Sequence, residues 1–122
     1  FINQALSGET LEIYGDGSQT RDFIYVNDLL QAVYLAATKE NVGGEVFQIA
    51  TNKETTVLEM TEMLVSILQE AGIDGFDLRH GEKRVGDVMR NFSDTRKANS
   101  LLSWRVKTNL LEGLEKTVLW FL

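Results

Sequence analysis

The stretch Leu11 to Leu30, LEIYGDGSQTRDFIYVNDLL, decides the fold of this chain. It predicts a strand over Leu11 to Tyr14, a polar loop over Gly15 to Thr20, a second strand over Phe23 to Val26 and a helix that starts at Asn27. Arg21 stands between the loop and the second strand, and its planar guanidinium can offer a fork of donors to a phosphate. From spacing alone the simpler interpretation, a hairpin with a surface arginine, is favoured.

The composition is that of a globular domain. The chain has 122 residues, of which 43% are hydrophobic and 25% charged, which suits one domain with a core. The net charge of −6 argues against nucleic-acid binding, because a phosphate backbone requires a basic face. There is no apolar run of the roughly 18 residues that a membrane helix needs, and no signal-peptide pattern.

Cysteine and histidine usage limits the chemistry. Cysteine is absent, which excludes disulfides and zinc–thiolate sites and fits a reducing compartment, so we expect a cytoplasmic protein. His80 is the only histidine, which excludes a multi-histidine metal site, and its neighbours predict a solvated loop. We therefore expect no bound metal.

Strand and helix patterns alternate along the chain, which predicts an α/β fold. Helices are expected over Phe1 to Leu6, from Asn27 or Asp28 through Ala37, from Thr55 or Thr56 to Gly72, from Asp94 to Leu102 and from Asn109 to Phe121. Further strands are expected at Glu45 to Ala50, Phe76 to Arg79 and Val88 to Phe92. The apolar stripes expected to face the core are Leu29, Ala32, Val33, Ala36 and Ala37, and Leu110, Leu111, Leu114, Val118 and Phe121.

Two further segments complete a recognisable pattern. They are GEVFQIATNKETTVLEMTEML (Gly44 to Leu64) and RVGDVMRNFSDTRKANSLLSW (Arg84 to Trp104), followed by LLEGLEKTVLWF. In this order and spacing, they and the opening stretch resemble the carboxy-terminal half of the NAD-dependent nucleotide-sugar epimerases and dehydratases, the extended short-chain dehydrogenases/reductases. The UDP-glucose 4-epimerase branch is the most similar. The resemblance implies that residues 1–122 form a single substrate-binding domain, with a small mixed sheet and packed helices but no complete Rossmann half.

The resemblance also implies a nucleotide-sugar site formed by Tyr14, Arg21, Gln48, Arg84, Asp87 and Asn91. It assigns Tyr14 to the nucleobase, Arg21 and Arg84 to the diphosphate, and Asp87 to a ribose hydroxyl. Gln48 is expected near the nucleotide and Asn91 against the sugar. Two fork-shaped guanidiniums suit a diphosphate better than a lysine does. Without the resemblance, Arg84 and Asp87 read as a loop ion pair worth about 0–1 kcal/mol.

The chemistry of the family depends on features that this sequence lacks. There is no glycine-rich loop between a strand and a helix to bind a dinucleotide. The catalytic Tyr-x-x-x-Lys pair is also missing, since the three tyrosines are followed four residues later by Ser18, Leu29 and Thr38. The chain starts at Phe1 in what reads as mid-helix sequence, so we expect it to be part of a longer enzyme. NAD is expected in that intact parent, and we expect no catalytic residue and no bound cofactor in this chain alone.

Alternatives remain open. The sequence does not separate an epimerase from a dehydratase or decarboxylase, nor UDP from dTDP or GDP. The chain could instead be a self-associating module with no ligand role, because loss of the dinucleotide-binding half would expose apolar surface and sheet edges. We expect a homo-oligomer, and exchange of structural elements between the copies is one way to form it. An unrelated enzyme that uses Asp16, Asp22 or Asp28 is disfavoured, since these carboxylates suit turn and cap positions.

Overall fold

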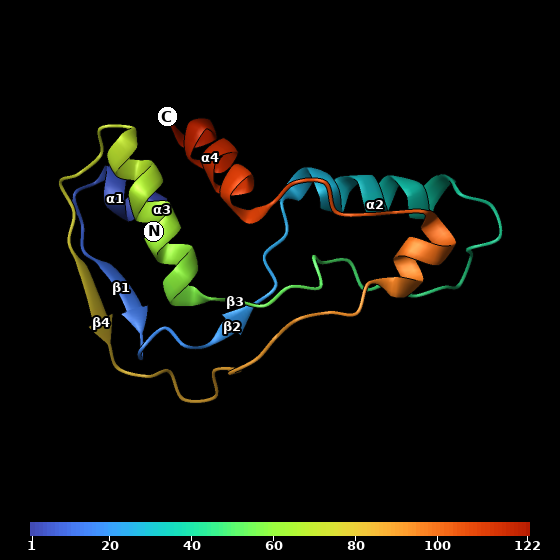
Figure 1. Cartoon of the computed structure of the whole chain (residues 1–122), viewed down its shortest axis with the longest axis horizontal. Coiled ribbons are helices and arrows are strands. Elements are labelled where there is room, and N and C mark those ends of the chain that lie inside the picture. Colours follow the sequence, from blue (N-terminus) through green and yellow to red (C-terminus); the bar gives the residue numbers. More distant parts are fainter.

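The computed structural model describes residues 1–122, which form two packed regions (Figure 1). The first region contains α1 (Ile2–Leu6), β1 (Leu11–Tyr14), α3 (Val57–Glu70), β4 (Leu78–Gly81) and α4 (Leu110–Phe121). The second contains α2 (Val26–Thr38) and the short π-helix η1 (Ala98–Leu102). Two short strands, β2 (Thr20–Arg21) and β3 (Thr55–Thr56), lie between the two regions. The α/β class is therefore confirmed.

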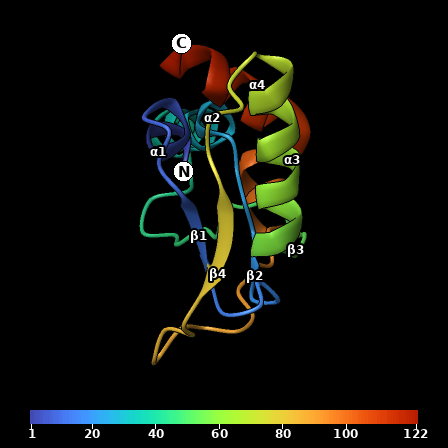
Figure 2. The same ribbon diagram turned by 90° about the vertical axis from the view of Figure 1, so that its left-hand side faces the viewer.

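The four strands form two separate pairs. β1 and β4 are parallel, in a register that sets Leu11 opposite Leu78. β2 and β3 are antiparallel, with Arg21 opposite Thr55. Figure 2 shows α3 running beside these strands. Leu11 and Ile13 are fully buried, as the alternation of β1 predicts for the side of a strand that faces a core.

Each region has its own small hydrophobic core. The first joins α1, β1, α3 and α4 through Ala5, Leu11, Leu64, Leu68 and Val118. The second joins α2 and η1 to the chain around them through Ala32, Val42, Ala98, Leu102 and Trp104. The indole N–H of Trp104 also donates to the main-chain oxygen of Asp28 at 2.9 Å, which ties the segment after η1 to α2.

The predictions for the starts of α3 and α4 are confirmed. The hydroxyl of Thr56 accepts a hydrogen bond from the Glu59 amide, and the Glu59 carboxylate accepts one from the Thr56 amide, which completes a capping box. The Asn109 side chain caps α4 by accepting from the Glu112 amide at 2.9 Å. Both helices therefore begin where their capping residues predict.

Three predicted strands do not form. Phe23 to Val26, Glu45 to Ala50 and Val88 to Phe92 have no strand pairing, although Ile24, Phe47 and Ile49 pack against the second core. Apolar and β-branched residues indicate burial, but a strand also requires a partner backbone. The predicted strand at Phe76 to Arg79 is shifted to Leu78–Gly81, which puts His80 in β4 rather than in a loop.

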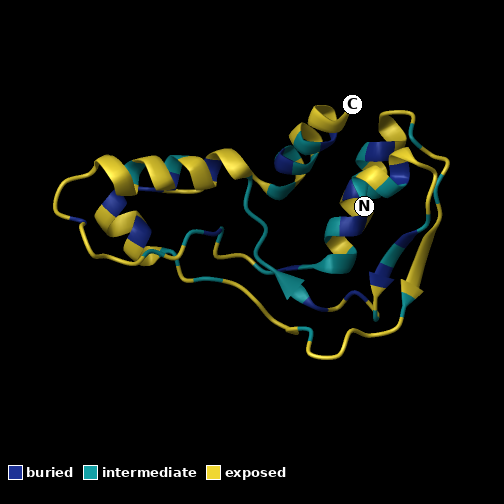
Figure 3. Ribbon diagram, turned by 180° about the vertical axis from the view of Figure 1, so that it is seen from behind, coloured by how far each residue is buried: buried dark blue, intermediate teal, exposed yellow.

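The expected start and buried face of α2 are also wrong. The helix begins at Val26, and the Asp28 carboxylate accepts from the amides of Lys107 and Thr108 instead of capping its own helix. Of the predicted stripe only Ala32 is buried, while Val33 is 57% exposed. Figure 3 shows α2 as largely exposed. In α4 the exposed members of the predicted stripe are Leu111 and Phe121.

An ion pair fastens the long loop after β4 to the β2–β3 pair. Arg90 donates to both carboxylate oxygens of Glu54, at 2.9 and 2.6 Å, and the Thr20 hydroxyl donates to the same carboxylate at 2.7 Å. The hydrogen bonds from Arg90 and then Thr20 lower the pKa of Glu54 to about 2. The loop is therefore fixed beside Arg21.

None of the helices combines the length and the apolar character that crossing a membrane requires.

Gly17 is expected to be the glycine least tolerant of a side chain. Its φ is +76°, and a Cβ there would lie 2.9 Å from Leu58 Cβ. Gly72 has a similar φ of +80° but open space around it, so it controls for backbone strain. We expect Gly17→Ala to lower the free energy of unfolding by about 1–3 kcal/mol more than Gly72→Ala does, as measured by urea denaturation. Equal losses in the two variants would contradict this packing.

The Glu54–Arg90 pair predicts a loss of stability in acid. The pKa of Glu54 is about 2 in the folded chain, below its ordinary value of 4.5. The carboxylate therefore stabilises the fold above pH 4.5 and stops doing so as the pH falls toward 2. We expect Glu54→Gln to flatten the fall of the urea midpoint in this window. Glu62→Gln, at an exposed carboxyl without an ion pair, is the control, and identical pH profiles for wild type and Glu54→Gln would refute the assignment.

Candidate functional site

The residues predicted for the nucleobase and for one phosphate contact each other. Tyr14 ends β1 and is 38% exposed, and the Arg84 guanidinium carbon lies 4.4 Å from the centre of its ring. This is the geometry of a cation–π contact. Arg84 forms no ion pair, so its N–H groups face no competing carboxylate.

The other predicted arginine pairs with the predicted ribose residue. Arg21 is the last residue of β2, and its Nη2 donates to the Asp87 carboxylate at 2.5 Å. Its Nη1 donates to the main-chain oxygens of Thr20 and Val88, at 2.7 and 2.6 Å. The side chains of Arg21 and Asp87 are 27% and 24% exposed, so the pair is reachable from solvent. One loop thus brings Arg84 to the end of β1 and Asp87 to the end of β2.

The two remaining predicted residues are less closely tied to this cluster. Gln48 is exposed, and its Oε1 accepts from the Ser93 hydroxyl at 3.3 Å. Asn91 is exposed and makes no side-chain hydrogen bond with another predicted site residue. The structure therefore brings together Tyr14 with Arg84 and Arg21 with Asp87. Gln48 and Asn91 are exposed, and no hydrogen bond joins either to these two pairs.

Two acidic residues that organise this region were not predicted. The Asp22 carboxylate accepts from the amide and hydroxyl of Thr51, from the Asn52 amide and from the Ser93 amide. It thereby joins three segments at the point where Gln48 meets Ser93. Its position directly after Arg21 was a signal, but turn chemistry explained it equally well. Nothing local in the sequence links Glu54 with Arg90, because the two are far apart in the chain.

The glycines of the β1–β2 turn do not form a dinucleotide cradle. The φ angles of Gly15 and Gly17 are +71° and +76°, but Gly17 is buried against Leu58 rather than open to a ligand. The Asp16 carboxylate between them accepts from the Ser18 hydroxyl and amide, and these bonds lower its pKa. No helix start follows the turn to receive a pyrophosphate. This turn therefore offers no cradle for the pyrophosphate of a dinucleotide. No group of three or more acidic or metal-ligating side chains is placed to hold a metal ion.

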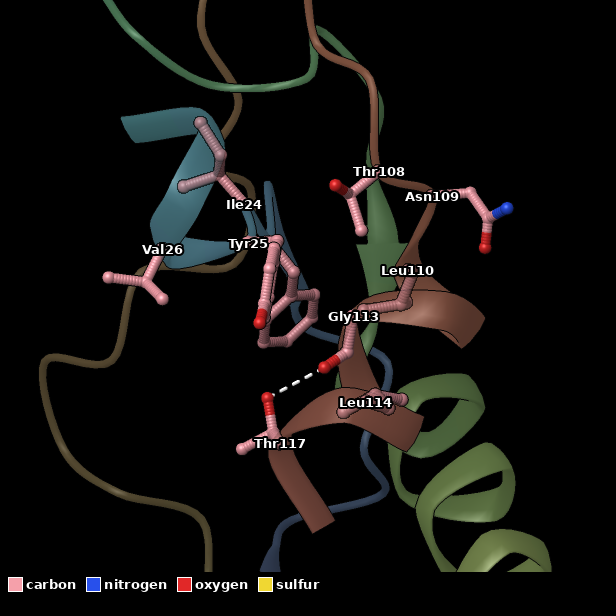
Figure 4. Close-up of a pocket in the computed structure, with 10 residues that line it drawn as sticks. Ile24, Tyr25, Val26, Thr108, Asn109, Leu110, Gly113, Leu114 and Thr117 are labelled. Atoms are coloured by element: carbon pink, nitrogen blue, oxygen red, sulfur yellow. Dashed lines mark hydrogen bonds between the residues drawn. The ribbon is translucent and has the colours of Figure 1, made fainter. Parts of the chain in front are cut away.

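Two cavities of the chain lie away from the predicted site. A cavity of about 300 Å³ separates the start of α2 from α4, where Tyr25 lies beside Gly113 and Leu114 (Figure 4). The Thr117 hydroxyl, on the same side, donates to the main-chain oxygen of Gly113 at 2.6 Å. A neighbouring cavity of about 320 Å³ is lined in part by Lys53, Thr55 and Lys107. None of the six predicted site residues lines either cavity, and four of them are exposed, so their cluster is an open surface.

Known proteins match nearly the whole chain. Residues 1–117 match the family model described as GDP-mannose 4,6 dehydratase. The UDP-glucose 4-epimerase of Thermotoga maritima, solved with UDP-glucose, is 38% identical with a TM-score of 0.85, over 98% of this chain and 37% of that one. MoeE5, solved with UDP-glucuronic acid and NAD, is 36% identical with a TM-score of 0.84, over 98% and 39%. The dTDP-glucose 4,6-dehydratase of Haemophilus influenzae is 35% identical over 99% of this chain and 38% of its own length.

These similarities confirm the predicted resemblance and the predicted fold. The chain spans 37–39% of the length of the three relatives. It matches epimerases and dehydratases alike, at similar identity. By sequence and by fold, the chain belongs to the GDP-mannose 4,6 dehydratase family, among the nucleotide-sugar epimerases and dehydratases of the extended short-chain dehydrogenases/reductases.

Proposed function

We propose that this chain is the nucleotide-sugar-binding part of an NAD-dependent nucleotide-sugar 4-epimerase, with UDP-sugars as its ligands. The observation that carries the proposal is the convergence of one loop on the ends of two strands. This loop brings Arg84 to Tyr14 and Asp87 to Arg21. Two relatives over 35% identical were solved with UDP-glucose and with UDP-glucuronic acid, which supports a UDP-sugar as the ligand class.

Each residue has a role in this proposal. Arg21 and Arg84 bind the diphosphate, whose two charges suit two guanidiniums. Tyr14 and the main chain of β1 line the nucleobase, and Asp87 accepts from a ribose hydroxyl. Gln48 lies beside the nucleotide and Asn91 toward the sugar. Contacts of this kind orient a reacting sugar without taking part in the chemistry.

The chain is proposed to bind and not to catalyse on its own. The support is the lack of a Tyr-x-x-x-Lys pair and of a glycine-rich dinucleotide loop in the sequence. NAD belongs, in this proposal, to the intact parent enzyme, as it does to the solved MoeE5 complex. A cytoplasmic location goes with this assignment. A parent enzyme that is a nucleotide-sugar dehydratase is an alternative within this proposal, and the match to a dTDP-glucose 4,6-dehydratase supports that alternative.

A titration with UDP and UDP-glucose tests the proposal. We expect weak binding, with a Kd on the order of 1 mM, because an open surface buries little of a ligand. Arg21→Ala and Arg84→Ala should each weaken binding about tenfold or more, since each removes a charge-assisted contact. Isothermal titration calorimetry measures this, with Arg96→Ala as the control because Arg96 pairs with Asp94 outside the cluster. Absence of heat at millimolar UDP would overturn the proposal, and so would binding that neither Arg21→Ala nor Arg84→Ala weakens.

The exposed face of α2 favours a second candidate, a self-associating module whose partner is a second copy of the chain. Leu30, Val33 and Tyr34 on α2 are 58%, 57% and 66% exposed, and Leu119 and Trp120 on α4 are 73% and 79% exposed. Apolar side chains gathered on a helix in this way mark surfaces that bind other surfaces. Exchange of elements between copies is one way to cover them.

Light scattering over a concentration series tests this second candidate. We expect a mass that rises above 13.7 kDa with concentration. Val33→Glu should shift the chain toward the monomer, because it puts a charge into the apolar face. Val85→Glu, at a fully exposed loop position, is the matched control and should leave the mass unchanged. A monomer at every concentration would rule the module out.

A further inference from the structure

Arg21, the proposed diphosphate residue, is already occupied by a carboxylate in the free chain. Three of its five N–H donors are in use, two on main-chain oxygens and one on Asp87. The bonds to Thr20 and Val88 fix the plane of the guanidinium, and the bond to Asp87 neutralises its charge. A phosphate that approached Arg21 would therefore meet a negative group already beside it.

Arg84 is in a different state. It lies over the Tyr14 ring, is exposed and has no acidic partner. A phosphate can bind it without displacing any carboxylate. The two arginines of the proposed site thus differ in what a ligand must do to reach them, and only one of them is blocked.

The loop does not depend on Asp87 for its place. The main-chain oxygen of Val88 accepts a hydrogen bond from Arg21, and that of Met89 accepts one from the Thr20 amide at 2.8 Å. Arg90 forms an ion pair with Glu54. Rotation of the Asp87 side chain alone can therefore free Arg21 while the loop stays attached to β2.

We propose that the Asp87 carboxylate is an internal stand-in for a phosphate. It pairs with the Arg21 guanidinium in the free chain and is displaced when a ligand with two adjacent phosphates binds. The inference rests on the proposed function, and it makes Asp87 a specificity-determining residue. A ligand with one phosphate is neutralised by Arg84 and leaves the Arg21–Asp87 pair intact. A second phosphate supplies the competing charge that releases Asp87, which then accepts from the ribose hydroxyls. A carboxylate placed against the wrong ligand is a recognised way to gain specificity.

The test compares UDP with UMP, which share the base and the ribose and differ in one phosphate. The amide oxygen of Asn can still accept from a ribose hydroxyl, so Asp87→Asn removes the competing charge and keeps an acceptor at this position. Wild type, Asp87→Asn and Asp94→Asn are titrated with both nucleotides by calorimetry at one salt concentration. Asp94 is the matched control, because it carries the same charge in the same loop but pairs with Arg96. We expect Asp87→Asn to raise the preference for UDP over UMP about two- to fivefold, as removal of a partly exposed competing pair predicts. Asp94→Asn should leave the preference unchanged.

A second measurement needs no variant and guards against a variant that does not fold. In ¹⁵N NMR spectra of the wild-type chain, the Arg21 Nε–H signal should shift with UDP and stay in place with UMP. An unchanged or reduced UDP preference in Asp87→Asn, or equal shifts of Arg21 with both nucleotides, would overturn the stand-in while leaving nucleotide binding established. If neither wild type nor any variant binds UDP, the proposed function fails and this inference fails with it.

Discussion

The contacts that Arg21 makes with the loop after β4 are the interactions on which the rest of the proposed site depends. Arg21 comes from a two-residue strand, and Asp87 from a loop that is otherwise exposed. The guanidinium joins them through one carboxylate and one main-chain oxygen, and Arg90 and Glu54 repeat the arrangement a few residues further on. These polar contacts take the place of a buried core beneath the loop. Because they are few and reachable by water, each is sensitive to salt and to charged ligands.

Local chemistry explains which parts of the fold could be predicted from sequence. Thr56 and Asn109 cap their helices because a side-chain oxygen reaches a free amide three residues later, and such signals are contained in short stretches. The strand at Phe23 to Val26 could not be judged in this way, since pairing depends on a distant backbone that the pattern does not name. Family resemblance indicated Arg21 and Asp87 as site residues. Their contact with each other could not be predicted, because it joins two segments that are far apart in the sequence. Glu54 and Arg90 carried no local signal at all.

The exposed apolar surface and the open site have a common physical basis. The chain spans little more than a third of its relatives' length, and its two small cores bury only part of the apolar positions of α2 and α4. The nucleotide residues form an open surface, while the cavities described above lie elsewhere, one between α2 and α4 and one beside Lys53 and Lys107. A ligand bound to such a surface makes contacts on one side only. Charged contacts must therefore supply the binding free energy that an enclosed pocket would gain by burying the ligand.

A crystal structure of the chain soaked or grown with UDP tests the central claim most directly. The account predicts that the diphosphate oxygens lie within hydrogen-bond distance of both the Arg21 and Arg84 guanidiniums, with Asp87 turned away from Arg21 and the base beside Tyr14. UDP found instead in the cavity between α2 and α4, with the Arg21–Asp87 pair intact, would contradict it.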